Sequence, residues 1–107
     1  MIDVVFRIEL DTYHITAKGH ALFDKKGKDL LCCAVSTLLQ SFIVGLNQIG
    51  ETIVDFKKDN GYLKIDVKKI NDKTRLLLDF IFINLKVIEN EHSTHIKITL
   101  EEPYGRS

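Results

Sequence analysis

The sequence predicts an α+β fold in which five strands and two helices follow the order ββαββαβ. Two observations support this prediction. Apolar residues alternate with polar ones in five short segments, which is the period of a half-buried strand. In two longer segments they recur at helical spacing. We therefore expect a two-layer sandwich, with a mostly antiparallel five-stranded sheet and both helices packed on one face.

The first two predicted strands form a hairpin near the N-terminus. In residues 2–10 every second residue is apolar. Residues 11–12 break this alternation and predict a tight turn, after which it resumes over residues 13–17. We expect the second strand to end at Gly19. The apolar positions are Ile2, Val4, Phe6, Ile8 and Leu10 in the first strand, and Tyr13, Ile15 and Ala17 in the second.

The first predicted helix covers residues 30–49. Asp29 is a candidate N-cap, because its carboxylate can accept the free amide hydrogen of Cys32, three residues later. Gly50 follows the last apolar position and is suited to end a helix. The apolar residues that define the helical spacing are Leu31, Val35, Leu38, Phe42, Leu46 and Ile49.

The second half of the chain predicts a hairpin, a helix and a last strand. Val54 and Phe56 indicate the third strand, Asp59-Asn60-Gly61 is typical of a hairpin turn, and the alternation in residues 63–68 indicates the fourth strand. Asn71-Asp72 is expected to cap a second helix that ends near Asn90.

The last predicted strand covers residues 96–100, and residues 101–107 form a polar tail that we expect to fray. Both predicted helices are apolar around more of their circumference than one face of a sheet can cover. This excess predicts either a thick two-layer core or a homodimer that buries part of the helical surface. The sequence leaves both possibilities open.

Composition indicates one globular domain over residues 1–107, with 45% hydrophobic and 28% charged residues. Fifteen basic residues balance fifteen acidic ones, which argues against nucleic acid as a direct partner. The N-terminal stretch MIDVVFRIEL lacks the apolar region of a signal peptide, and no apolar run approaches the roughly 18 residues of a membrane span. We therefore expect a cytoplasmic protein with free thiols and no membrane partner.

Cys32 occupies a position that favours a cysteine nucleophile. If Asp29 is the N-cap, Cys32 lies in the first helical turn, where the helix dipole and free amides favour the thiolate. The thiolate is the nucleophilic form of cysteine. His20 precedes Cys32 by twelve residues, and the intervening segment is long enough to bring its imidazole against the thiol. There it could act as base toward the thiol and as acid toward a leaving amine.

Two polar residues and a second cysteine flank Cys32 on the predicted helix. Asp29 and Ser36 lie three residues before and four after it, so the three residues share one helix face. Asp29 has two open roles, as the N-cap or as a carboxylate that orients His20. Cys33 is offset from Cys32 by about 100° around the helix and cannot face the same site. We predict that Cys33 is a small buried hydrophobic residue.

A short motif around the histidine and the cysteine resembles that of a known family. The sequence reads GHA at residues 19–21 and G-x-D-x-x-C-x-x-x-S at residues 27–36. This motif, with its spacing of twelve residues from histidine to cysteine, resembles the Prp family of bacterial ribosomal-processing cysteine proteases. The predicted ββαββαβ order agrees with that family over the whole chain.

The resemblance implies a small dimeric cysteine protease. Such an enzyme removes the N-terminal extension of ribosomal large-subunit protein twenty-seven, cleaving after a phenylalanine pair, during ribosome maturation. The resemblance implies Cys32 as the nucleophile and His20 as the general base. It further implies Asp29 and Ser36 as supporting residues, and Gly19 as the residue that allows a tight strand exit beside His20. Phe23 and Tyr13 are candidates to line an apolar groove for the phenylalanine pair, although such residues more often pack in a core.

A metal site and a non-catalytic binding module are the alternatives to proteolysis. No C-x-x-C or H-E-x-x-H spacing occurs, so we predict neither a metal site nor a cofactor. The alternative function is a non-catalytic ribosome-assembly module of the same fold. The balanced charge argues against broad RNA affinity but is compatible with a protein partner. The residues of metal-ligand type are His14, His20, Cys32, Cys33, His92 and His95.

Overall fold

The strands form a single five-stranded sheet in the computed structural model, which describes residues 1–19, 30–59 and 61–102, except for the side chains of Leu30 and Cys32. The strand order in the sheet is β3-β4-β2-β1-β5. All neighbours are antiparallel except β1 and β5, which run parallel. The elements are β1 (Ile2–Ile8), β2 (Thr12–Lys18), α1 (Leu30–Gln48), β3 (Ile53–Asp59), β4 (Tyr62–Lys68), α2 (Asp72–Glu91) and β5 (Ile96–Glu101).

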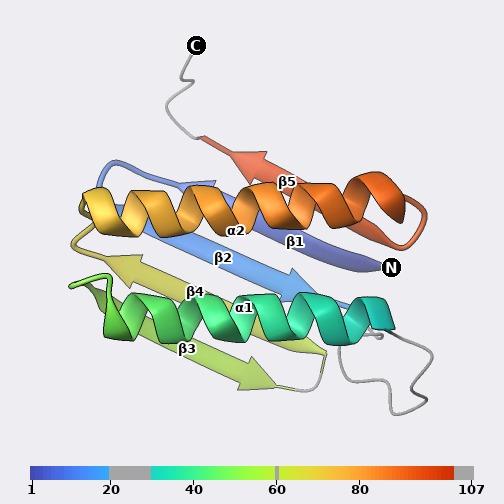
Figure 1. Ribbon diagram of the computed structural model, residues 1–107, viewed down its shortest axis with the longest axis horizontal. Helices are drawn as coiled ribbons and strands as arrows, with labels where there is room; N and C mark the ends of the chain where they lie inside the picture. The colour runs from blue at the N-terminus through green and yellow to red at the C-terminus, as the bar shows by residue number, and fades with distance from the viewer. Residues whose placement is uncertain (20–29, 60, 103–107) are drawn as a thin grey trace.

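Both helices lie on the same face of this sheet and run across it side by side (Figure 1). The predicted α+β class, the ββαββαβ order and the two-layer arrangement are therefore confirmed. Neither helix, within the described part of the chain, is long and apolar enough to span a lipid bilayer.

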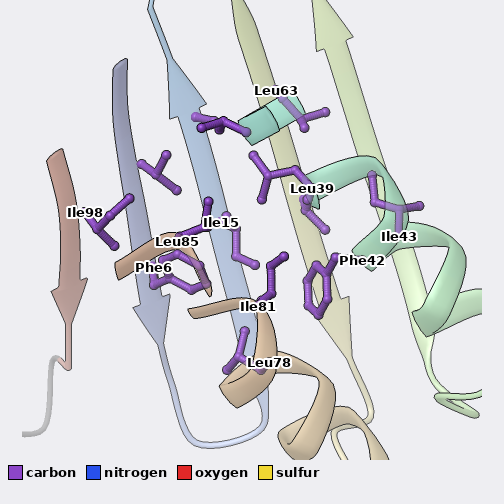
Figure 2. Close-up of a cluster of buried hydrophobic side chains, with 14 of the residues drawn as sticks. Phe6, Ile15, Leu39, Phe42, Ile43, Leu63, Leu78, Ile81, Leu85 and Ile98 are labelled. Carbon is purple, nitrogen blue, oxygen red and sulfur yellow. The ribbon is translucent and has the colours of Figure 1, made fainter. Parts of the chain in front are cut away.

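The core lies between the helices and the sheet. Alternate strand residues such as Phe6 and Ile15 point toward the helices, where they meet Leu39 of α1 and Leu85 of α2 (Figure 2). The ring of Phe6 packs edge-to-face on Phe82, with ring centroids 5.1 Å apart. Each large apolar side chain buried in this layer stabilises the fold by about 1.5–3 kcal/mol relative to exposure.

The turn between β1 and β2 corrects one prediction. β1 ends at Ile8, and the Glu9 amide donates a hydrogen bond to the Thr12 carbonyl at 3.0 Å. Leu10 therefore lies in the turn, where it is 82% exposed, and its assignment to the first strand is wrong. The apolar alternation continues through Leu10, but the backbone bond that closes the hairpin takes this residue out of the sheet.

The start of α2 confirms the predicted cap and joins the two helices. The Asn71 side-chain oxygen accepts a hydrogen bond from the Thr74 amide at 3.0 Å, which satisfies one free amide of the first turn. The Asn71 side-chain amide donates to the Gly50 carbonyl at 2.7 Å. The buried Thr74 hydroxyl donates to the same carbonyl at 3.3 Å. These bonds position the end of α1 against the beginning of α2.

Candidate active site

The structure places the predicted nucleophile at the start of a helix. α1 begins at Leu30, as predicted, so Cys32 is the third residue of the helix. Its backbone therefore belongs to the first turn, where amide groups have no partner within the helix. The predicted base His20 and the predicted cap Asp29 lie outside the described residues.

Gly19 occupies a position that excludes any side chain. A Cβ atom built on Gly19 would lie 2.9 Å from the Met1 carbonyl oxygen and 3.0 Å from the Ile2 Cα. The Gly19 amide donates a hydrogen bond to the Gly61 carbonyl at 3.1 Å. The chain therefore leaves β2 through a close backbone contact, directly before His20, and only glycine fits there without displacing backbone atoms.

The two ends of the segment that contains His20 and Asp29 lie at one end of the sheet. Figure 1 shows the tip of β2 and the first turn of α1 at the same end of the molecule, beside the hairpin between β3 and β4. Strand register agrees, because Lys18 of β2 pairs with Tyr62, which also pairs with Asp59 at the end of β3. Gly19, the last described residue before His20, and the first turn of α1 therefore lie at the same end of the sheet.

Ser36 lies one helical turn after Cys32. It is half-buried, and its hydroxyl accepts a hydrogen bond from the Gln40 side-chain amide at 2.8 Å. Residues 32, 36, 40 and 43 fall within about 80° of one another around the helix. The sequence does not predict Gln40 as a site residue, because a single glutamine within a helix belongs to no recognised sequence motif.

Cys33 contradicts its predicted burial. Its side chain is exposed, with the sulfur 4.0 Å from the Thr37 hydroxyl. The buried face of α1 runs through Val35, Leu39 and Leu46, and Cys33 lies on the other side of the helix. The prediction is wrong because the sheet covers only one face of α1, so an apolar neighbourhood in sequence does not bury every residue of the helix.

Tyr13 does not line an open groove. Its side chain is buried in the core against the helices, while Phe23 lies outside the described residues. Tyr13 is therefore a core residue, which is the more usual role of such an aromatic side chain.

In the described part of the chain, no group of three or more histidine, cysteine, aspartate or glutamate side chains is arranged to hold a metal ion.

The described histidines make local contacts. His14 lies on the open face of the sheet between two carboxylates, with its Nδ1 2.6 Å from Asp66 Oδ1 and its Nε2 3.0 Å from Glu9 Oε1. The contact with His14 lowers the pKa of Glu9 from its ordinary value. His92 caps the C-terminus of α2, and His95 Nδ1 lies 2.9 Å from the Thr94 hydroxyl, so both histidines precede β5.

A family model described as cysteine protease Prp matches residues 1–97 of the chain. The chain belongs to the Prp family. The resemblance seen in the GHA and G-x-D-x-x-C-x-x-x-S motifs is thereby confirmed, and the chain is a cysteine protease by family.

Named relatives agree with this assignment. The ribosomal processing cysteine protease Prp of Mycoplasma genitalium is 31% identical, over 94% of this chain and 99% of its own length. The Prp of Bacillus subtilis is 25% identical, over 76% of this chain and 79% of its own length. The crystal structure of Prp from S. aureus with a covalently linked product peptide has a TM-score of 0.83 at 23% identity, covering 94% and 100% of the two chains. That likeness shows that the Prp fold is shared.

Proposed function

We propose that this protease removes the N-terminal extension of the precursor of ribosomal large-subunit protein twenty-seven, in the cytoplasm, during ribosome maturation. The single observation that carries the proposal is the family match over residues 1–97. The name of the Mycoplasma genitalium relative, a ribosomal processing protease, supports the class of substrate.

Cys32 is the proposed nucleophile and His20 the proposed general base. His20 takes the proton of the Cys32 thiol, and the thiolate attacks the scissile carbonyl carbon and forms a carbon–sulfur bond, while an electron pair of the carbonyl moves to its oxygen. The tetrahedral intermediate collapses, the carbon–nitrogen bond breaks, and His20 gives its proton to the leaving amine. Water, deprotonated by His20, then hydrolyses the thioester and returns the free thiol.

Backbone amides in the first turn of α1 are the proposed oxyanion donors. A donor of this kind typically stabilises the transition state by about 3–4 kcal/mol. If the Asp29 carboxylate accepts the Cys32 amide hydrogen as an N-cap, that amide is unavailable to the oxyanion. Asp29 therefore either caps the helix or orients His20 during the reaction, and Ser36 supports the site from the next helical turn.

The active form is proposed to be a homodimer. An apolar stripe on α2 lies opposite the buried face of that helix, and its four side chains are 54–71% exposed. The spacing of four, three and four residues places them in a narrow line, as in the seam of a helix pair. The thick-core interpretation leaves this stripe uncovered, whereas a second copy of α2 would bury it. The α2 stripe consists of Leu76, Phe80, Ile83 and Val87.

The test is cleavage of a peptide that contains the extension and the first residues of the mature ribosomal protein. The wild type and Cys33→Ala should cleave it at one bond, identified by mass spectrometry, and Cys32→Ala should be inactive. Cleavage that survives Cys32→Ala but is lost in Cys33→Ala would overturn the assignment of the nucleophile. Binding of the peptide without cleavage by any folded form would favour the non-catalytic ribosome-assembly module.

A further inference from the structure

A small apolar groove lies between α1 and the edge of the sheet. It has a volume of about 180 Å³. Ile43 and Leu63 form its floor, and both are buried and point into the core (Figure 2). The groove is lined by Gln40, Ile43 and Val44 of α1, Phe56 and Lys58 of β3, and Leu63 of β4.

Two walls of this groove are large apolar side chains that the chain leaves open. Phe56 pairs across the strands with the buried Ile65, so it points to the helix side of the sheet, yet it is 56% exposed. Val44 of α1 is 59% exposed on the opposite wall. Because exposed apolar surface is stabilised by contact with another apolar group, these walls favour an apolar occupant.

The groove continues the helix face on which Cys32 lies. Residues 32, 36, 40 and 43 share one side of α1, and the last two of them line the groove. Gln40 and Val44 are eight and twelve residues beyond Cys32, which corresponds to about 12–18 Å along the helix axis. An extended peptide advances about 3.3 Å per residue, so this distance corresponds to about four or five substrate residues.

The strand beside the groove is suited to an extended peptide. β3 is the terminal strand in the order β3-β4-β2-β1-β5, so among the described strands it pairs on one side only. A strand added along its outer side would place alternate side chains toward α1. A cavity of about 150 Å³ with apolar walls accommodates benzene, so a groove of about 180 Å³ suits one phenylalanine or leucine side chain.

We propose that this groove is a specificity pocket for one large apolar side chain of the substrate peptide, four or five residues from the scissile bond. The peptide lies extended along β3, with the scissile bond at the start of α1. This inference rests on the proposed function, since it assigns a subsite to the same active site. It makes Phe56 and Val44 residues that determine specificity without taking part in the chemical step.

The test combines variants of the groove with variants of the substrate. Alanine is placed in turn at each of the six substrate positions on either side of the scissile bond, and kcat/KM is measured for each peptide. The wild type should lose about tenfold or more at one position four or five residues away. Phe56→Ala and Val44→Gln should cleave the unaltered peptide about tenfold more slowly, and should no longer respond to alanine at that position.

The matched control is Ile53→Ala, which removes an exposed apolar side chain from the same strand on the other face of the sheet. Ile53→Ala should retain the full response to the substrate. Equal loss on all peptides, or no loss, in both groove variants would overturn the pocket, whereas absence of cleavage by the wild type would overturn the proposed function itself. Binding of the same peptides to Cys32→Ala separates these two failures. If the pocket exists, Cys32→Ala combined with Phe56→Ala should bind the unaltered peptide more weakly than Cys32→Ala alone, even when no form of the protein cleaves it.

Discussion

The Gly19 amide and the Gly61 carbonyl oxygen form a hydrogen bond of 3.1 Å that ties the end of β2 to the hairpin between β3 and β4. Glycine is favoured at both positions, because a side chain on Gly19 would meet the backbone of Met1 and Ile2, and Gly61 has a left-handed backbone conformation. Gly61 has a φ of +67°, and a Cβ atom on it would lie 3.1 Å from the Gly19 carbonyl oxygen. Because His20 follows directly, this pair of glycines fixes the point at which the chain leaves the sheet toward the proposed base.

Replacement of Gly19 by alanine should therefore destabilise the protein and reduce proteolysis. The new methyl group would meet the backbone of Met1 and Ile2, which cannot move without shifting β1. We expect a loss of about 1–3 kcal/mol in the free energy of unfolding, measured in urea. Gly45→Ala is the matched control, because its Cβ would lie an ordinary 3.7 Å from Leu77. Equal midpoints for Gly19→Ala and the wild type would contradict the steric account.

Short-range patterns predicted the elements of this fold, because each depends on neighbours within a few residues. The Asn71 cap is an example, since its bond to the Thr74 amide is set by a spacing of three residues. Leu10 was misassigned because the bond between Glu9 and Thr12 closes the hairpin before the apolar alternation ends. Cys33 was misassigned because its exposure depends on which face of α1 meets the sheet.

The groove was missed for a related reason. Phe56 was predicted to be a strand residue, which is correct, but its exposure follows from the position of β3 at the edge of the sheet. Strand order is a long-range property that the local pattern does not contain. The adjacent Lys57 and Lys58 were the available signal, because lysines are typical of edge strands.

Alkylation of Cys32 should occur at a lower pH than alkylation of an ordinary thiol. Iodoacetamide reacts with the thiolate. A free cysteine has a pKa of about 8.5, so it reacts efficiently only near or above that pH. In Cys33→Ala, the rate measured from pH 5 to pH 9 should rise well below that value, because the first turn of α1 favours an anion. The Cys32→Ala variant gives the profile of the exposed Cys33 alone. Superimposable profiles for the two variants would contradict an activated Cys32.

The Glu89 carboxylate should make stability depend on acidic pH. It accepts a hydrogen bond from the Ile98 amide at 2.7 Å and contacts the Lys86 ammonium at 2.7 Å, which joins α2 to β5. The Ile98 amide is the main cause that lowers the pKa of Glu89 below its ordinary value of 4.5, with smaller contributions from Lys86 and Lys97.

Because the folded pKa is the lower one, this stabilisation is present above about pH 4.5 and is lost as the pH falls through the folded pKa. Glu89→Gln should cost about 1 kcal/mol in urea unfolding at pH 7, and the difference from the wild type should shrink between about pH 5 and pH 3. Glu91→Gln, at an exposed position in the same helix, is the control. A difference that stays constant over this range would argue against Glu89 as the titrating group.

Disruption of the α2 stripe should convert a dimer into a monomer. Sedimentation of the wild type at micromolar concentration should give twice the 12.3 kDa of one chain. Ile83→Asp places a charge at the centre of the stripe, where a second copy of α2 would have to desolvate it, so the mass should fall to that of one chain. Val44→Asp is the control, because it also places an aspartate at an exposed apolar position, but on α1 and outside the α2 stripe. A wild type that sediments as a monomer would contradict the dimer. An Ile83→Asp variant that stays dimeric would place the interface elsewhere.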